Sequence, residues 1–291
     1  MNRSTRLAAL ALVQTLVAAG CSERGPIAPT GLGPNVAQSP PVAATGELVN
    51  GIVYDTGQRA VGGATVEVID GPQTGTSTIA NEKGEFSLRG TFDDATRFRA
   101  SKEGHTAEVK TLNPYCERCN PHRWIFFSLD VLAVPVSVAG DYTLTFIADA
   151  SCTTLPAEAR ARTYAATITP APHRPQTSFD VTVTGAPILA GYQKGWLSVA
   201  GDYVAFGVGD WHGRPGIVEE LARHTYVGFD GSAEASVQGA TLSTIATHFA
   251  GLIDYCERTS EVGATYDCSA SPGVVHKQCT SQTHRLVLTR R

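Results

Sequence analysis

Histidine, glutamate and cysteine residues form two short patterns whose chemistry is metal binding. The first is His105-x-x-Glu108, a spacing that can supply two zinc ligands in a peptidase. This pair falls in a segment with the pattern of a β-strand, where residues three positions apart point to opposite faces. Two side chains on opposite faces cannot bind one ion, and no helical His-Glu-x-x-His pattern occurs. A zinc peptidase is therefore not expected.

The second pattern is Cys116-x-x-Cys119, with His122 three residues further on. A thioredoxin-like role requires the first cysteine at a helix N-terminus, but Asn-Pro dipeptides flank this segment on both sides and indicate a loop. A zinc site would need a fourth ligand and thiolates that stay reduced. We expect a structural disulfide, within the loop or to another cysteine. A zinc site, a redox-active pair and free thiols are the alternatives.

Acidic residues and histidines also lie close together in the sequence between residues 212 and 224. Glu219 and Glu220 lie near His224 in the sequence, and Glu220 and His224 would be neighbours on a helix. We interpret these residues as a solvated polar face. An envelope hydrolase that uses His212, Glu219 or His224 is an alternative. The chain contains no Gly-x-Ser-x-Gly elbow, phosphate-binding glycine loop or dinucleotide fingerprint.

Aromatic residues could form a ligand-binding loop near these positions. Tyr192 and Trp196 lie four residues apart, and Trp211 and His212 begin a Trp-His-Gly-Arg-Pro-Gly segment. Aromatic faces stack against the apolar faces of sugars and peptides. We name these four residues as candidate ligand contacts; aromatic side chains that only cap the end of a barrel are the alternative.

The N-terminus has the pattern of an export signal. Arg3 and Arg6 precede an uncharged run at residues 7–20, which is too short to cross a bilayer as a helix. The run ends in Leu-Val-Ala-Ala-Gly-Cys at residues 16–21, which resembles the lipobox of bacterial lipoproteins, with alanine at a position where leucine is more usual. An ordinary signal peptide with an incidental cysteine is the alternative.

The lipobox resemblance implies that residues 1–20 are removed and that Cys21 carries the lipid. The protein would then be attached to a membrane through a lipid anchor. Because Ser22 and not aspartate follows Cys21, the resemblance also implies the outer membrane of the cell envelope in a Gram-negative host.

Seven cysteines are an odd number for an exported chain, and lipidation of Cys21 would leave six that can pair. Six cysteines allow fifteen connectivities, so the sequence does not give the pairing. The six disulfide candidates are Cys116, Cys119, Cys152, Cys256, Cys268 and Cys279.

Composition and charge limit the classes of partner and of fold. A net charge of −4 gives no bulk electrostatic reason to bind nucleic acid. Only 17% of residues are charged, and 29 are glycine, which favours short strands and turns. The chain carries no motif that predicts a cofactor or a metal ion. Residues 21–46 are rich in proline and glycine and indicate a tether without a core of its own.

Residues 47–133 are expected to form the first folded domain. Their alternating segments predict seven short strands and a small antiparallel sandwich, with strands at residues 47–54, 64–69, 76–80, 85–88, 96–100, 106–112 and 124–129. The segments Val61-Gly-Gly-Ala-Thr-Val66, Asn81-x-x-Gly84-x-Phe86 and Ala100-Ser-Lys-Glu-Gly-His105 resemble the carboxypeptidase regulatory-like domain. That resemblance implies an Ig-like, transthyretin-like (prealbumin-like) sandwich of the carbohydrate-binding-like fold group, with no catalytic role.

Residues 134–291 are expected to form a second antiparallel β domain, a barrel or a sandwich. Strands are predicted at residues 142–146, 179–184, 196–199, 203–206, 224–229, 232–240, 242–249 and 284–288, and short helices at 155–162 and 217–223. A barrel would pair the strand near Tyr142 with the last strand near Leu286 and so remove both sheet edges. The first and last strands have a lipocalin-like pattern.

From these patterns we expect an all-β, lipid-anchored cell-envelope protein without enzymatic activity. It would act as a binding or scaffold module for an envelope protein or a glycan. One alternative is a carrier that holds an apolar or carbohydrate ligand inside the C-terminal barrel. The other alternative is the envelope hydrolase described above.

Overall fold

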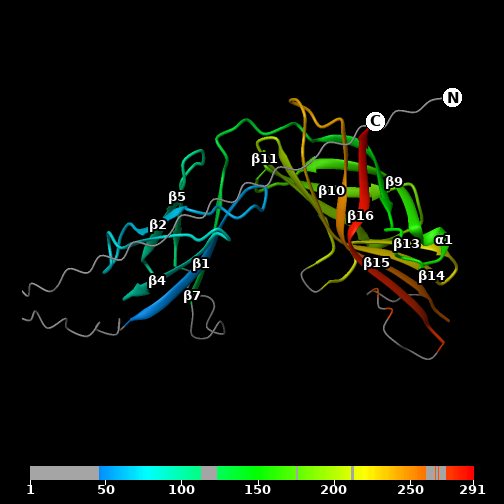
Figure 1. The fold of residues 1–291 in the computed structure, drawn as a ribbon, viewed down its shortest axis with the longest axis horizontal. Coiled ribbons are helices and arrows are strands. Elements are labelled where there is room, and N and C mark those ends of the chain that lie inside the picture. The colour runs from blue at the N-terminus through cyan, green and yellow to red at the C-terminus, as the bar shows by residue number, and fades with distance from the viewer. Residues whose placement is uncertain are drawn as a thin grey trace, which may run out of the picture. The chain divides into compact units, whose positions relative to one another are not determined.

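A computed structural model gives the fold of the chain. It describes residues 46–112, 123–174, 176–210, 213–259, 266, 268 and 273–291. These residues form sixteen strands and one short helix, α1 (Ala157–Arg160), so the predicted all-β class is confirmed (Figure 1). Within these ranges, no helix is long and apolar enough to span a membrane. The predicted signal peptide and Cys21 lie outside the described residues.

The seven strands predicted in the first folded region are confirmed, and they form two sheets. One sheet has the order β3 (Ser77–Ile79), β2 (Thr65–Val68), β5 (Arg97–Ser101) and β6 (Glu108–Thr111). The other has the order β4 (Glu85–Gly90), β1 (Glu47–Asp55) and β7 (Arg123–Leu129). The expectation of an entirely antiparallel sandwich is wrong at one pair, because β1 and β7 run parallel.

The two sheets share one apolar core because their strands alternate between buried and exposed residues. In β4 every second residue is buried, beginning with Phe86. Phe86 and Phe127 of one sheet and Phe98 and Val66 of the other belong to the same buried cluster. This alternation is the reason that the sequence pattern located these strands.

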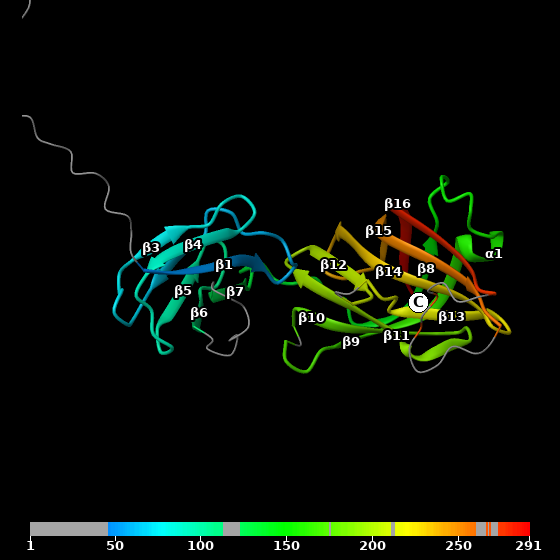
Figure 2. The same ribbon diagram turned by 90° about the horizontal axis from the view of Figure 1, so that it is seen from below.

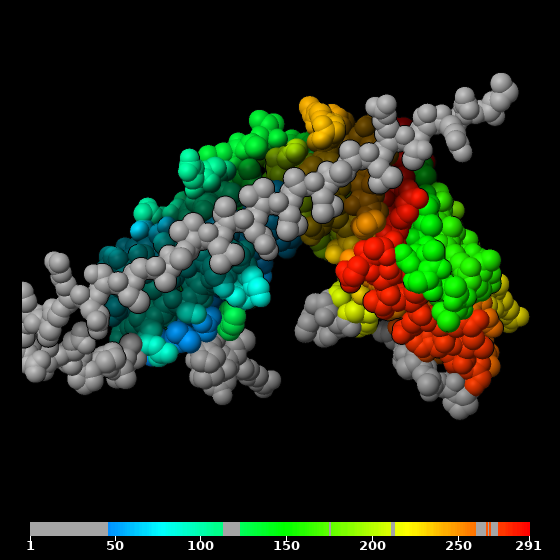
Figure 3. Space-filling view, viewed as in Figure 1, coloured from blue at the N-terminus to red at the C-terminus, as the bar shows by residue number. Residues whose placement is uncertain are grey.

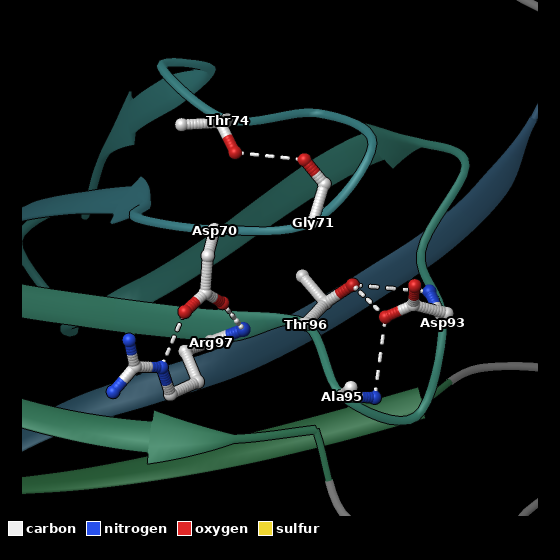
Figure 4. Close-up of polar contacts among 7 residues, drawn as sticks. All are labelled: Asp70, Gly71, Thr74, Asp93, Ala95, Thr96 and Arg97. Carbon is white, nitrogen blue, oxygen red and sulfur yellow. Dashed lines mark hydrogen bonds and ion pairs between the residues drawn. The ribbon is translucent and has the colours of Figure 1, made fainter.

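Polar contacts fix the loops that lead into β5 (Figure 4). Asp70 accepts a hydrogen bond from the Arg97 backbone nitrogen (2.8 Å) and pairs with its guanidinium, which lowers the pKa of Asp70. Thr96 is fully buried and donates a hydrogen bond to the Asp93 carboxylate (2.7 Å). Gly71 has a φ of 96°, and a Cβ there would lie 2.7 Å from the Thr96 hydroxyl, so only glycine fits.

The C-terminal part is an eight-stranded antiparallel barrel, which decides between the two architectures left open by the sequence. The last strand pairs with the first, from Arg285 opposite Ile147 to Arg290 opposite Tyr142, so the predicted closure is confirmed. Figure 2 shows these two strands side by side, and in the space-filling view (Figure 3) the C-terminal strand (red) lies against the green segment. The wall consists of β8 (Gly140–Ile147), β9 (Ala161–Pro170), β10 (Ser178–Thr184), β11 (Ile188–Ala200), β12 (Tyr203–Val208), β14 (Thr225–Ser236), β15 (Thr244–Glu257) and β16 (Val275–Arg290).

Both predicted helices need correction. The segment 155–162 contains a helix of only four residues, because Ala161 already pairs with Ile147 as the start of β9. The segment 217–223 contains the strand β13 (Ile217–Ala222), which pairs with β11 and β14. Ile217 and Val218 are both buried on opposite faces of this strand. A strand covered on both faces lacks the alternation that identifies a strand.

β12 and β13 together occupy one position in the barrel wall. Both run antiparallel to β11 and to β14, and they pair with different halves of these two strands. The connection at residues 209–216, of which 209, 210 and 213–216 are described, leaves the wall as a loop. This interruption is the feature that positions the candidate site described below.

Aromatic side chains fill the barrel interior. Phe146 stacks on Phe229 with ring centroids 4.5 Å apart and meets Phe249 edge-on at 5.1 Å. Tyr164 and Phe206 lie around the same ring. An eight-stranded barrel is wide enough for its own side chains or for one small ligand. In the described part of this barrel, the aromatic side chains around Phe146 occupy the interior.

One ion pair places its carboxylate in this aromatic core, whereas 27% of the side chain of its partner Arg162 is exposed. Glu219, only 1% exposed, accepts hydrogen bonds from Arg162 Nε and the Tyr164 hydroxyl, both at 2.8 Å. The predicted solvated face is therefore wrong for Glu219. Burial and the neighbouring Glu219 carboxylate both raise the pKa of Tyr164, so its hydroxyl stays protonated as a donor.

We predict that Arg162→Ala lowers the free energy of unfolding by about 3–5 kcal/mol, because it leaves the Glu219 carboxylate buried without a cation. Urea denaturation at neutral pH measures this change. The double variant Arg162→Met with Glu219→Leu is the control and should retain most of the stability, since neither charge remains. A single variant as stable as the parent chain would contradict the role given to this pair.

Candidate functional site on the barrel wall

Two of the four residues named as candidate ligand contacts belong to the part of the chain that the structure describes. Tyr192 and Trp196 both lie on β11, whereas Trp211 and His212 lie outside the described residues. The Trp196 indole packs over Gly207, where an added Cβ would lie 2.3 Å from the ring. Tyr192 is the candidate that lines a pocket.

Among the residues that the structure describes, two disulfides join four of the candidate cysteines. Cys152 pairs with Cys279, and Cys256 pairs with Cys268. The second of these links joins the end of β15 to the segment that follows it. Cys116 and Cys119 lie outside the described residues, so their expected disulfide stays a prediction.

The other patterns that suggested chemistry are not assembled into one site. His105 lies near the backbone oxygen of Glu103, while the Glu108 carboxylate accepts a hydrogen bond from the Ser128 backbone nitrogen (2.6 Å). Glu219 lies in the barrel interior, and His224 lies at the turn between β13 and β14 with a φ of 61°. The Glu220 carboxylate accepts a hydrogen bond from the His224 backbone nitrogen (3.1 Å), so these two predicted neighbours do meet. His105, Glu108 and Glu219 have other partners.

The loop at residues 209–216 closes on itself through one acidic and one basic residue. The Asp210 carboxylate accepts hydrogen bonds from the Arg214 backbone nitrogen (3.1 Å) and from Arg214 Nε (2.7 Å). The Asp210 backbone nitrogen in turn donates to the Arg214 carbonyl (3.1 Å). These hydrogen bonds hold the Arg214 guanidinium at the surface, where 57% of the Arg214 side chain is exposed.

A second carboxylate lies beneath the loop. Asp230, on β14, lies so close to Gly209 that a Cβ at this glycine would be 1.7 Å from its Oδ1. Among the described residues nothing donates a hydrogen bond to the Asp230 carboxylate. Burial, and then repulsion by Asp210, raise the pKa of Asp230 to about 6. The loop therefore covers an acidic group that is close to its titration point at neutral pH.

The loop and β11 enclose a pocket of about 330 Å³ on the outside of the wall. Tyr192 and Lys194 contribute from β11, while Asp210, Arg214 and Pro215 contribute from the loop. The residues that line this space thus include a tyrosine, two cationic side chains and a carboxylate. This combination suits a polar ligand that also has an apolar face.

Tyr192 is held in place by the disulfide-linked segment. Its hydroxyl accepts a hydrogen bond from the Tyr266 backbone nitrogen, and the two rings meet edge-on with centroids 6.2 Å apart. Tyr266 packs in one buried cluster with Tyr226 and the disulfide of Cys256 and Cys268. The buried cluster around the Cys256–Cys268 disulfide therefore supports the Tyr192 side of the pocket.

Sequence reasoning missed Lys194, Asp210, Arg214 and Asp230. The Gly-Asp-x-x-Gly-Arg-Pro-Gly composition of the loop is a turn signal that could have located Asp210 and Arg214. No local signal indicates Lys194 or Asp230, because each reaches the site only through strand register.

Neither a scan against protein-family models nor a search of curated proteins finds a match. The candidate site therefore rests on its own geometry.

We predict that Asp230→Asn stabilises the protein at pH 7 by about 1–2 kcal/mol and leaves its stability at pH 4 nearly unchanged. The folded pKa of about 6 lies above the usual value for aspartate. The folded state therefore holds its proton more tightly, and stability is lost as the pH rises from about 4 to about 6. Thermal unfolding at several pH values measures this. Asp180→Asn, at an exposed position on β10, is the control, and an equal response of both variants would refute the assignment.

Proposed function

We propose that the protein is a lipid-anchored cell-envelope protein that binds a saccharide in the pocket between β11 and the loop at residues 209–216. The observation that carries this proposal is the convergence of the Tyr192 ring with Lys194, Asp210 and Arg214 on one pocket. A sugar presents an apolar C–H face to an aromatic ring and hydroxyl groups that both donate and accept hydrogen bonds. Tyrosine, cationic and carboxylate side chains match those two features.

A site on the wall agrees with the packing better than a ligand inside the barrel. The rings around Phe146 take up the described interior, and the buried Glu219 carboxylate already has Arg162 as its partner there. A carrier would have to displace these aromatic side chains to admit a ligand. The loop pocket is open to solvent and requires no such displacement.

A binding role, rather than hydrolysis, is supported by the chemistry of the pocket. The described residues that line it include no serine, cysteine or histidine that could act as a nucleophile. The Asp210 carboxylate is engaged by Arg214. Binding without catalysis is accordingly part of the proposal.

The anchor and the first folded region complete the proposal. The lipobox resemblance at residues 16–21 supports lipidation of Cys21 and an outer-membrane location in a Gram-negative host. The seven strands at their predicted positions support a carboxypeptidase regulatory-like, transthyretin-like domain at residues 47–133. In this proposal that domain is a spacer between the tether and the barrel at residues 134–291.

We predict that Cys21→Ser releases the protein from membranes. Mass spectrometry of the parent chain should show a mature N-terminus at Cys21 with a mass increase of two or three acyl chains, and the variant should lack this increase. Retention of the variant in the membrane fraction after carbonate washing, or an unmodified Cys21 in the parent chain, would exclude the anchor.

We predict that the detergent-purified full chain binds envelope glycans on a saccharide array, with affinity then measured by calorimetry. Tyr192→Ala should weaken binding by about tenfold, because the stacking ring is lost. Phe126→Ala is the matched control, since Phe126 is an aromatic residue with 52% exposure outside this pocket. Equal loss of binding in both variants, or no binding of any glycan, would overturn the saccharide proposal.

A further inference from the structure

A buried histidine lies beside a disulfide in the barrel core. His284, on β16, is fully buried, and its ring centroid is 6.4 Å from that of Phe249. The disulfide joins Cys152, which follows β8, to Cys279 on β16. One ligand atom from each of these three residues lies within 4.8 Å of the others. Leu155 belongs to the same buried cluster as Cys152.

His284 presents an unprotonated nitrogen toward the sulfur atoms. Its Nδ1 accepts a hydrogen bond from the Asp149 backbone nitrogen (2.9 Å), which places the ring proton on Nε2. Nε2 is buried and has no hydrogen-bond partner in the described structure. An Nδ1 that accepts a hydrogen bond belongs to a neutral imidazole, which is the form that binds metal ions.

The spacing of the donor atoms already suits a bound ion. The Cys152 Sγ and His284 Nδ1 are 3.9 Å apart. Bonds of about 2.3 Å to sulfur and about 2.0 Å to nitrogen, at about 120°, would separate these two atoms by about 3.7 Å. Opening the S–S bond would therefore leave two thiolates and one imidazole around a common point.

We propose that reduction of the Cys152–Cys279 disulfide creates a buried binding site for a thiophilic d¹⁰ cation, Zn²⁺ or Cu⁺. A dithiol reductant supplies two electrons and two protons, the protein disulfide becomes two thiols, and the reductant becomes a disulfide. The cation then displaces the two thiol protons and binds two sulfur atoms and Nδ1 of His284, in place of the Asp149 amide. Thiolate and imidazole are the ligands that these soft ions prefer. The proposal is independent of the saccharide site.

The second disulfide offers a control within the same chain. Cys256 and Cys268 lie among Val218, Tyr226 and Tyr266. Among the residues that the structure describes, only Cys152, Cys279 and His284 meet the spacing of a three-ligand metal site. Reduction of the second disulfide should therefore create thiols without a site.

The test uses the full chain with Cys21→Ser, Cys116→Ser and Cys119→Ser, so that only the two described disulfides can supply thiols. The chain is reduced with dithiothreitol, freed of reductant without oxygen, and titrated with Zn²⁺ or Cu⁺ in separate arms. We expect one ion per reduced chain and none for the oxidised chain. Adding Cys152→Ser and Cys279→Ser should abolish binding, whereas Cys256→Ser and Cys268→Ser should not.

Two further measurements keep the test decisive if a serine variant fails to fold. The bound ion should slow alkylation of Cys152 and Cys279 by about tenfold or more, but not that of Cys256 and Cys268, as read by mass spectrometry. His284→Leu should weaken binding by about tenfold or more. Failure of the reduced chain to bind either ion, equal protection of all four cysteines, or unchanged affinity in His284→Leu would overturn the proposal. Tighter binding in one arm identifies the ion.

Discussion

Closure of eight strands into a barrel constrains everything else in the C-terminal part. Pairing of β8 with β16 removes both edges of the sheet, but it also fixes the width of the interior. At eight strands that width is close to what side chains can fill, and the rings around Phe146 fill it. In our proposal the binding site therefore lies on the wall, where a strand can be interrupted without opening the core.

The break between β12 and β13 provides such an interruption. Because β11 and β14 continue past the break and pair with both strands, the wall stays closed while residues 209–216 leave it. The ion pair between Asp210 and Arg214 then shapes this loop. The barrel supplies rigidity, and the loop supplies the groups that can contact a ligand.

Much of this fold could be predicted from alternation, and the failures have a physical reason. Strands with one buried face, such as β4 and β8, alternate clearly and were located to within a few residues. β13 was predicted as a helix because the barrel core covers Ile217 while the tyrosine cluster covers Val218. At 155–162, alanine, glutamate and arginine favour a helix, but pairing with β8 extends strand β9 back to Ala161.

The candidate site could be predicted only in part, since its residues meet through register. Tyr192 was found from its aromatic character, whereas Lys194 and Asp230 became recognisable only once β11 and β14 were placed on either side of the interruption. Hydrogen–deuterium exchange of the full chain with and without a bound saccharide tests the central claim most directly. The account predicts slower exchange at residues 190–194 and 209–216 and unchanged exchange in β8 and β16. Protection in the core strands, with none at the loop, would contradict it.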